Sequence, residues 1–89
     1  MIGDVILPSF EEGDYIKRYK SPSIIVYGKK NDEYKGFFFA RIVDNQSSAV
    51  SNVVVIKKTH DEIRATIPWR MRRYPKGPDD DRNMLEFYI

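Results

Sequence analysis

The sequence predicts a small all-β protein, built on a strongly twisted antiparallel sheet of five to six strands. Its apolar runs are short and rich in β-branched and aromatic residues, which suits pleated, half-buried strands. Turn-forming residues separate these runs. No window keeps the i, i+3, i+4, i+7 spacing of an amphipathic helix for about ten residues. We therefore expect one short helix at most.

The N-terminal half predicts an edge strand and a hairpin. The apolar run at residues 5–7 is stopped by Pro8, which an edge strand tolerates. The aromatic and basic run at residues 15–20 predicts another short strand. Residues 23–27 and 36–43 flank a polar turn and predict a β-hairpin. The second of these runs is apolar on both faces, so we expect it to be the central strand.

The C-terminal half predicts three further segments. Residues 50–58 form an apolar strand, and residues 63–67 alternate between apolar and polar side chains, which indicates a second hairpin. Residues 84–89 predict a closing strand, and a sheet closed into an SH3-like or OB-like barrel would hide its edges. The residues of this last strand expected to face inward are Leu85, Phe87 and Ile89.

Length and composition bound the class of protein. At 89 residues, positions 1–89 are expected to form a single domain. Cysteine is absent, which excludes disulfides and the common zinc patterns and fits a reducing compartment. No apolar run approaches the roughly 18 residues of a membrane span, and no basic signal region begins the chain. A cytoplasmic protein is the expectation.

The net charge of +2 conceals an uneven distribution along the chain. Residues 1–14 carry −4, residues 15–76 carry +9, and residues 77–89 carry −3. A basic body between acidic ends favours an anionic partner. The alternative is that folding intermixes these charges into an ordinary solvated surface.

The most informative stretch is residues 67–76, Ile-Pro-Trp-Arg-Met-Arg-Arg-Tyr-Pro-Lys, which holds the only Trp. Its two prolines interrupt strand pairing, so a stiffened loop or irregular strand is predicted. Guanidinium groups beside aromatic rings suit phosphates and unstacked bases, and also protein interfaces. The alternative is a loop whose Trp69 plugs the end of the barrel and whose Arg side chains only solvate the surface. The predicted binding residues are Trp69, Arg70, Arg72, Arg73, Tyr74 and Lys76, helped by Lys17, Arg18 and Lys20.

Residues 35–42, Lys-Gly-Phe-Phe-Phe-Ala-Arg-Ile, resemble the RNP1 signature of RNA-recognition motifs, in which strand aromatics stack on bases. The spacing of the strands excludes that family. Its fold places a helix and a further strand between the two RNA-contacting strands, whereas only seven residues separate Tyr27 from Lys35. These Phe rings are therefore expected in the core of a central strand, with rings exposed on the sheet as the alternative.

No catalytic, metal or cofactor site is predicted. His60 is the only histidine and lies in a polar segment that offers nothing to orient it. Phosphate-cradling glycine loops and metal-ligand spacings are missing from the sequence. The Asp79–Asp81 run is expected to be a solvated loop, because divalent cations need oxygens that converge from several places. A second hypothesis is that this loop lies over the basic surface and competes with nucleic acid.

Two functions follow from these features. The first is a small, non-catalytic protein that binds RNA or single-stranded DNA through its basic and aromatic loop. The alternative is a protein-interaction module that inhibits a host enzyme, such as a nuclease, toxin or polymerase, by occlusion, with or without RNA in the complex. Neither function calls for a cofactor or a membrane.

Overall fold

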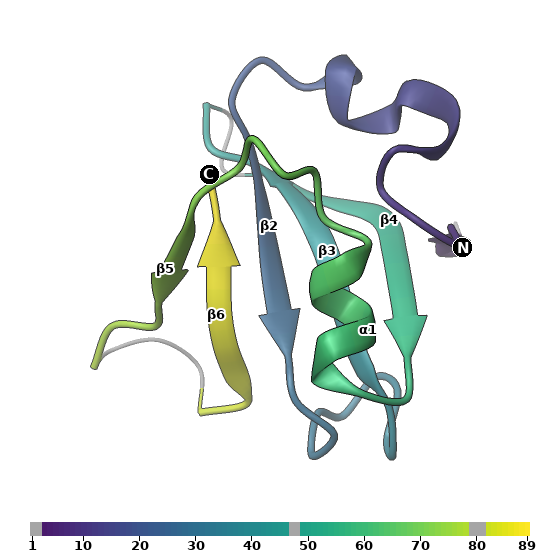
Figure 1. Ribbon diagram of the computed structural model, residues 1–89, viewed down its shortest axis with the longest axis vertical. Coiled ribbons are helices and arrows are strands. Elements are labelled where there is room, and N and C mark those ends of the chain that lie inside the picture. The colour runs from purple at the N-terminus through teal and green to yellow at the C-terminus, as the bar shows by residue number, and fades with distance from the viewer. Residues whose placement is uncertain (1–2, 47–48, 79–81) are drawn as a thin grey trace.

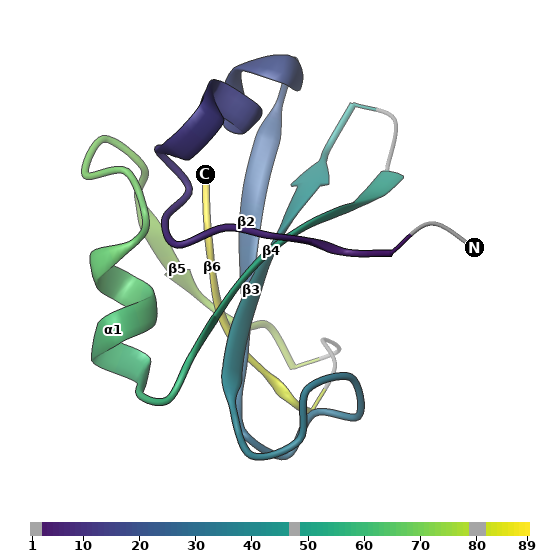
Figure 2. The same ribbon diagram turned by 90° about the vertical axis from the view of Figure 1, so that its right-hand side faces the viewer.

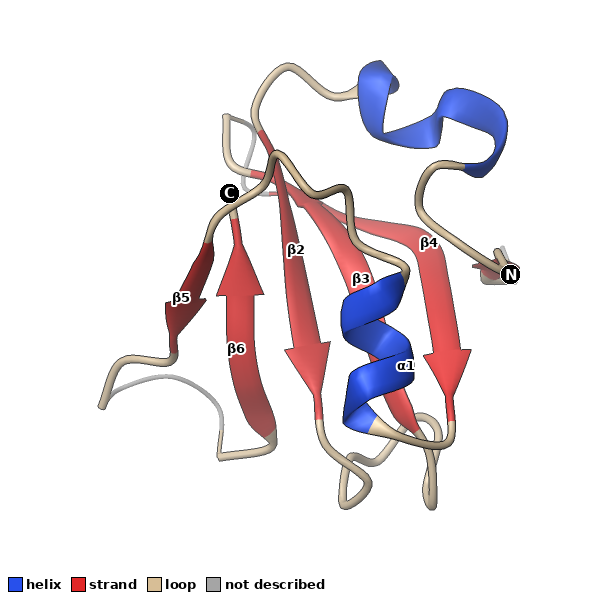
Figure 3. Cartoon of the chain, in the orientation of Figure 1, coloured by secondary structure: helices blue, strands red, loops and turns tan. Residues whose placement is uncertain are grey.

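A six-stranded sheet forms the centre of the computed structural model, which describes residues 3–46, 49–78 and 82–89 (Figures 1 and 3). The strands lie in the order β1-β4-β3-β2-β6-β5. Their bounds are β1 (Val5–Ile6), β2 (Pro22–Tyr27), β3 (Phe38–Asp44), β4 (Ala49–Lys57), β5 (Arg73–Pro75) and β6 (Met84–Tyr88). Two short helical elements, the 3-10 helix η1 (Glu12–Arg18) and the helix α1 (His60–Ala65), lie toward the same side of the sheet (Figure 2). The predicted all-β class with one short helix is confirmed.

The predicted hairpin is formed by β2 and β3, which pair antiparallel with Ile24 opposite Ile42 and Val26 opposite Ala40. β3 lies between β2 and β4, as expected for the central strand. Its side chains are buried on both faces of the sheet because Ala40 and Ile42 meet the core under α1, while Phe39 is covered on the other face.

The Phe residues of the RNP1-like stretch have different environments. Phe39 is buried and stacks on Tyr27 at 4.6 Å between ring centroids. Phe38 packs against the core, and Phe37 precedes β3 and remains partly exposed. The expectation of a core residue therefore holds for Phe39 and fails for Phe37.

The sheet is neither wholly antiparallel nor closed. β1 pairs parallel with β4, with Val5 opposite Val53. Within the described residues no pairing joins the two outer strands, β1 and β5, so a barrel is not formed. The edges are protected in another way, because both outer strands are very short and prolines lie at or near their ends, Pro8 beyond β1 and Pro75 in β5.

The core lies between the sheet and the two helical elements. β2, β3 and β4 contribute β-branched and small side chains to it, and α1 contributes Ile63, which is completely buried. Phe10 and Ile16 extend this core under η1. In the described part of the chain no helix is long and apolar enough to cross a bilayer.

The strand predicted at residues 63–67 is wrong, because α1 ends within this segment. The Thr59 hydroxyl caps the helix by accepting a hydrogen bond from the Glu62 backbone N–H at 3.1 Å. This is the first half of a capping box, and the Glu62 carboxylate lies 3.0 Å from the same hydroxyl. Ile63 and Ile67 are both buried, and a separation of four residues suits a helical turn as well as a strand.

The strand predicted at residues 15–20 is also wrong. Residues up to Arg18 form η1, and the Tyr19 backbone N–H donates to the Ile16 carbonyl across its end. Ile16 is buried, and Tyr15 and Tyr19 pack beside it on the core. Mixed aromatic and apolar residues thus serve a compact turn that covers the end of the sheet.

The closing strand β6 exists, but its faces are the reverse of those predicted. Glu86 and Tyr88 lie on the α1 side and are buried, Met84 is buried beyond a shift in register, Leu85 and Ile89 are exposed, and Phe87 is only half-buried. Both faces of this strand carry apolar side chains, so the alternation did not specify which face would be covered. The face of β6 that becomes buried is the one on which α1 packs.

Truncating Ile63 tests how strongly α1 depends on the sheet. Ile63→Ala should lower the free energy of unfolding by about 2–5 kcal/mol, because it leaves a cavity at the only buried position of the helix. Val50→Ala, at an exposed position of β4, is the matched control and should cost less than about 1 kcal/mol. Urea denaturation measures both. Equal effects would contradict the role of Ile63.

Candidate functional site

The Trp69 loop, residues 66–72, joins the end of α1 to β5 and is anchored by buried residues. Ile67 and Pro68 are buried, and the Met71 backbone N–H donates to the Pro68 carbonyl at 3.1 Å, which closes a tight turn. Trp69 lies within this turn and is 89% exposed. The indole is therefore presented to solvent by a rigid base.

A groove opens beside this loop, between η1 and the chain end of β6. It consists of two adjoining hollows of about 510 and 410 Å³ that share Ile16, Lys17 and Arg70. Lys20 lines one hollow and Glu11 the other. We call this feature the basic groove. Its cationic lining is Lys17, Lys20 and Arg70, and its apolar lining includes Ile16, Met71 and Ile89.

β5 divides the remaining predicted residues between two faces of the sheet. The Arg72 backbone exchanges hydrogen bonds with Ile89 at 2.9 and 3.0 Å, so regular pairing begins there. Arg73 lies on the α1 side, with Nη1 3.5 Å from the Glu86 carboxylate. Tyr74 lies on the opposite side and stacks on Phe87 at 5.5 Å, and strand alternation places Arg72 with it.

The other two predicted cations lie apart from the groove lining. The Arg18 guanidinium sits over the Tyr15 ring, 4.4 Å from its centroid. The Lys76 ammonium donates to the Arg82 carbonyl at 3.3 Å. Of the nine predicted residues, the fold gathers Lys17, Lys20 and Arg70 in one groove, with Trp69 adjacent, and distributes the others around it.

Sequence reasoning did not find a second polar assembly, which surrounds Glu86 under α1. Glu86 is only 2% exposed. Arg64 donates to both of its oxygens, from Nε at 3.2 Å and Nη2 at 2.8 Å. The Tyr88 hydroxyl donates at 2.6 Å, and His60 Nε2 lies 3.1 Å from the same carboxylate. These residues, together with Arg73, are called the Glu86 cluster.

Within the Glu86 cluster, the pKa values of Glu86 and Tyr88 are shifted. Burial alone would raise the pKa of Glu86, but hydrogen bonds from Arg64 and Tyr88, with His60 close by, outweigh it and lower the pKa to about 2. Burial and the bond to Glu86 raise the pKa of Tyr88 to about 12. A carboxylate this acidic, with both oxygens engaged, is an anchor for cations and is poorly suited to act as a general base.

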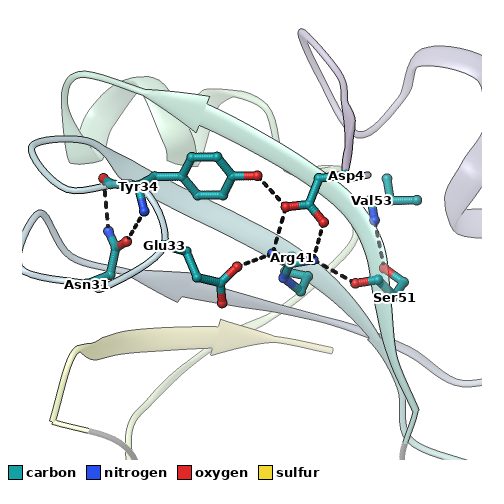
Figure 4. A network of polar contacts seen from close by, with 7 residues as sticks. All are labelled: Asp4, Asn31, Glu33, Tyr34, Arg41, Ser51 and Val53. Atoms are coloured by element: carbon teal, nitrogen blue, oxygen red, sulfur yellow. Dashed lines mark hydrogen bonds and ion pairs between the residues drawn. The ribbon is translucent and has the colours of Figure 1, made fainter. Parts of the chain in front are cut away.

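A third polar assembly lies on the opposite face, around the buried Arg41 (Figure 4). Its guanidinium binds Asp4 at 3.0 and 3.2 Å, the Ser51 carbonyl at 2.9 Å, and Glu33. The Tyr34 hydroxyl also donates to Asp4. The network ties the segment before β1, the β2–β3 loop and β4 onto β3, so its role is to hold the fold together.

The Arg41 network also shifts pKa values. Hydrogen bonds from Arg41 and then Tyr34 hold the pKa of Asp4 below its usual range. Burial, followed by the bond to Asp4, raises the pKa of Tyr34 to about 12. The β2–β3 loop is further fixed by Asn31, whose side-chain amide donates to the Gly28 and Phe37 carbonyls at 2.7 and 2.9 Å.

The sequence contains one signal that could have predicted part of the Glu86 cluster. The Thr59-x-x-Glu62 pattern is a capping box, and a helix starting there would have placed His60 and Arg64 on one face, four residues apart. No comparable signal connects Glu86 with Arg64 or Asp4 with Arg41, because those pairs meet only in the folded chain.

In the part of the chain that is described, no three His, Asp or Glu side chains come close enough together to hold a metal ion. The Asp79–Asp81 run, predicted to be a solvated loop, lies outside the described residues.

Comparison with known proteins assigns no family. No protein-family model, curated protein or solved structure matches the chain. The chemistry of its own side chains is therefore what bears on function.

Acid titration tests the anchoring role of Glu86. The folded pKa of about 2 lies below the ordinary value of 4.5, so the stabilisation is complete above pH 4.5 and is lost as the pH falls toward 2. As the pH falls from 4.5 to 2, the free energy of unfolding of the wild type should therefore drop by about 3 kcal/mol, toward that of Glu86→Gln. Glu11→Gln, at an exposed site, should keep the wild-type profile. Wild-type and Glu86→Gln curves that stay parallel would rule out the anchor.

Proposed function

We propose that this protein binds single-stranded nucleic acid, RNA or DNA, along the basic groove and does so without catalysis. The observation that carries the proposal is the convergence of Lys17, Lys20 and Arg70 on one groove beside an indole that is 89% exposed. An exposed Trp next to clustered cations is the combination that single-strand binders use for bases and phosphates.

The charged and the apolar side chains of the groove contact different parts of the nucleic acid. The cations neutralise phosphates and supply most of the affinity. The apolar side chains Met71 and Ile89 contact sugars and base edges, while Trp69 stacks on a base at the rim. Among the side chains that the structure describes in this lining, Glu11 is the one acid and lies in the hollow without Lys20, so phosphates are favoured at the Lys20 end.

A single strand suits this surface better than a duplex. Stacking on Trp69 requires a base with an open face, which a duplex does not offer along its length. The described residues contain one α-helix, α1, of six residues, and its buried face packs on the sheet. A recognition helix for the major groove is therefore not among them.

A protein partner is the second candidate. Trp and Arg are enriched in binding hot spots, and Ile89, which is 54% exposed, extends the apolar surface next to them. The surface would then occlude a host enzyme such as a nuclease, toxin or polymerase, with or without RNA. Co-purification from lysate with and without nuclease separates the two functions, because stoichiometric recovery of a protein after nuclease treatment favours this candidate.

Salt dependence tests the nucleic-acid proposal. Three phosphate contacts predict that the logarithm of the association constant falls with the logarithm of salt concentration with a slope of about −2 or steeper. Fluorescence anisotropy with a labelled oligouridylate or oligothymidylate of about 12 nucleotides measures this slope. Lys20→Gln should weaken binding and flatten the slope. Lys58→Gln, beyond β4 at the end of the sheet far from η1, is the control and should change neither (Figure 1). Absence of binding at about 50 mM salt would remove the proposal.

Replacing the indole tests stacking separately from charge. Trp69→Ala should weaken oligonucleotide binding by about 5- to 150-fold, the usual range for one base–aromatic stack, while leaving the salt slope unchanged. The fold should persist because the ring is almost fully exposed. Val50→Ala removes an equally superficial apolar group and should bind as the wild type does. An unaltered affinity for Trp69→Ala would exclude the ring from the site.

A further inference from the structure

We infer that Arg64 and Arg73 form a second phosphate subsite, which continues the basic groove across the α1 side of the sheet and is held in place by the buried Glu86. This inference rests on the proposed function, since it assigns to the same bound strand a second point of contact. None of its three residues lines the basic groove itself.

The Glu86 cluster carries an excess of positive charge that can bind an anion. Two guanidinium groups face one carboxylate, so the three residues carry a net charge of +1 before His60 is considered. The carboxylate is buried, whereas the side chains of Arg64 and Arg73 are 43% and 55% exposed. The acid therefore lies at the base of the cluster and the excess positive charge lies at its surface, where a phosphodiester carrying one negative charge can meet it.

Glu86 also fixes the orientation of the arginine that it binds most tightly. It accepts two hydrogen bonds from Arg64, and a guanidinium has five N–H donors in a planar fork. The side chain is thus held in one geometry with part of its fork directed outward. Holding it in advance lowers the conformational entropy that is lost when a phosphate binds, which makes a pinned arginine a better receptor than a mobile one.

The pair is adjacent to the basic groove. Arg70 lines the groove and precedes Arg73 by three residues, so their Cα atoms are at most about 11 Å apart. Arg73 pairs with Tyr88, while groove-lining Ile89 pairs with Arg72, so β5 begins beside the groove. Figure 1 shows the chain running from the end of α1 to the edge strand β5, past the C-terminal end of β6. A strand that leaves the groove over Arg70 can therefore reach Arg73 next.

The experiment compares Arg73→Gln with Arg72→Gln. Both variants remove one positive charge from adjacent positions, but Arg73 lies in the Glu86 cluster and alternation directs Arg72 to the opposite face. The probe is the labelled oligouridylate of about 12 nucleotides, and the readouts are its affinity and salt slope. Arg73→Gln should weaken binding about 10-fold at low salt and flatten the slope from about −3 to about −2. Arg72→Gln should lower the affinity by less than Arg73→Gln does, because Arg72 pairs with groove-lining Ile89 but is not held by Glu86.

The outcomes separate the two levels of the proposal. Wild-type protein that does not bind the oligonucleotide overturns the proposed function, and the subsite with it. Wild-type binding that Trp69→Ala weakens, but that Arg73→Gln and Arg72→Gln alter equally or not at all, overturns the subsite and leaves the groove intact. Urea denaturation of both arginine variants should give the wild-type midpoint, so that a loss of binding is not a loss of fold; a lowered midpoint for Arg73→Gln alone would assign Arg73 to the fold and overturn the subsite.

Discussion

Removing a carboxylate from water costs several kcal/mol unless hydrogen bonds and opposite charges replace its hydration. Glu86 meets this constraint by accepting hydrogen bonds from Arg64 and Tyr88, and Arg73 adds positive charge from the far end of the segment that carries Trp69. Arg64 reaches it from α1, before the loop, and Arg73 reaches it from β5, after the loop. The loop is therefore held at its α1 end by the hydrogen bonds of Arg64 to Glu86, and at its β5 end by the backbone pairing of Arg72 with Ile89.

Folding redistributes the charges that the sequence separates. Asp4 comes from the acidic N-terminal segment and Glu86 from the acidic C-terminal segment, yet each is bound to an arginine of the basic middle, Arg41 and Arg64. Intermixing therefore accounts for part of the pattern. The groove cations Lys17, Lys20 and Arg70 share a lining in which, among the described side chains, Glu11 is the one acid. Positive side chains therefore outnumber negative ones in the described part of this lining.

The order of apolar runs and turn residues along the sequence predicted the features that neighbouring residues determine. The β2–β3 hairpin and the central place of β3 followed from two apolar runs around a polar turn. The helix α1 was missed because Ile63 and Ile67 satisfy both helical and strand spacing over such a short segment, and the capping residue Thr59 decides between them. The face of β6 was missed for a different reason, since burial of Glu86 depends on Arg64, a partner from another element. Site residues showed the same division: the sequence left open whether Trp69 is exposed or buried at the end of a barrel, and the separation of Arg72 from Arg73 depends on the pairing of β5 with β6.

The shortness of β5 has a consequence for the way a partner can be recognised. Arg72 and Ile89 exchange both of their backbone hydrogen bonds, so alternation turns the peptide groups of Arg73 away from β6, toward the outer edge. Pro75, the next residue with that orientation, has no N–H to offer. A peptide laid along this edge as a seventh strand would find one main-chain donor in β5. Main-chain augmentation is therefore a weak mode of recognition at this edge, and selectivity here has to come from side chains.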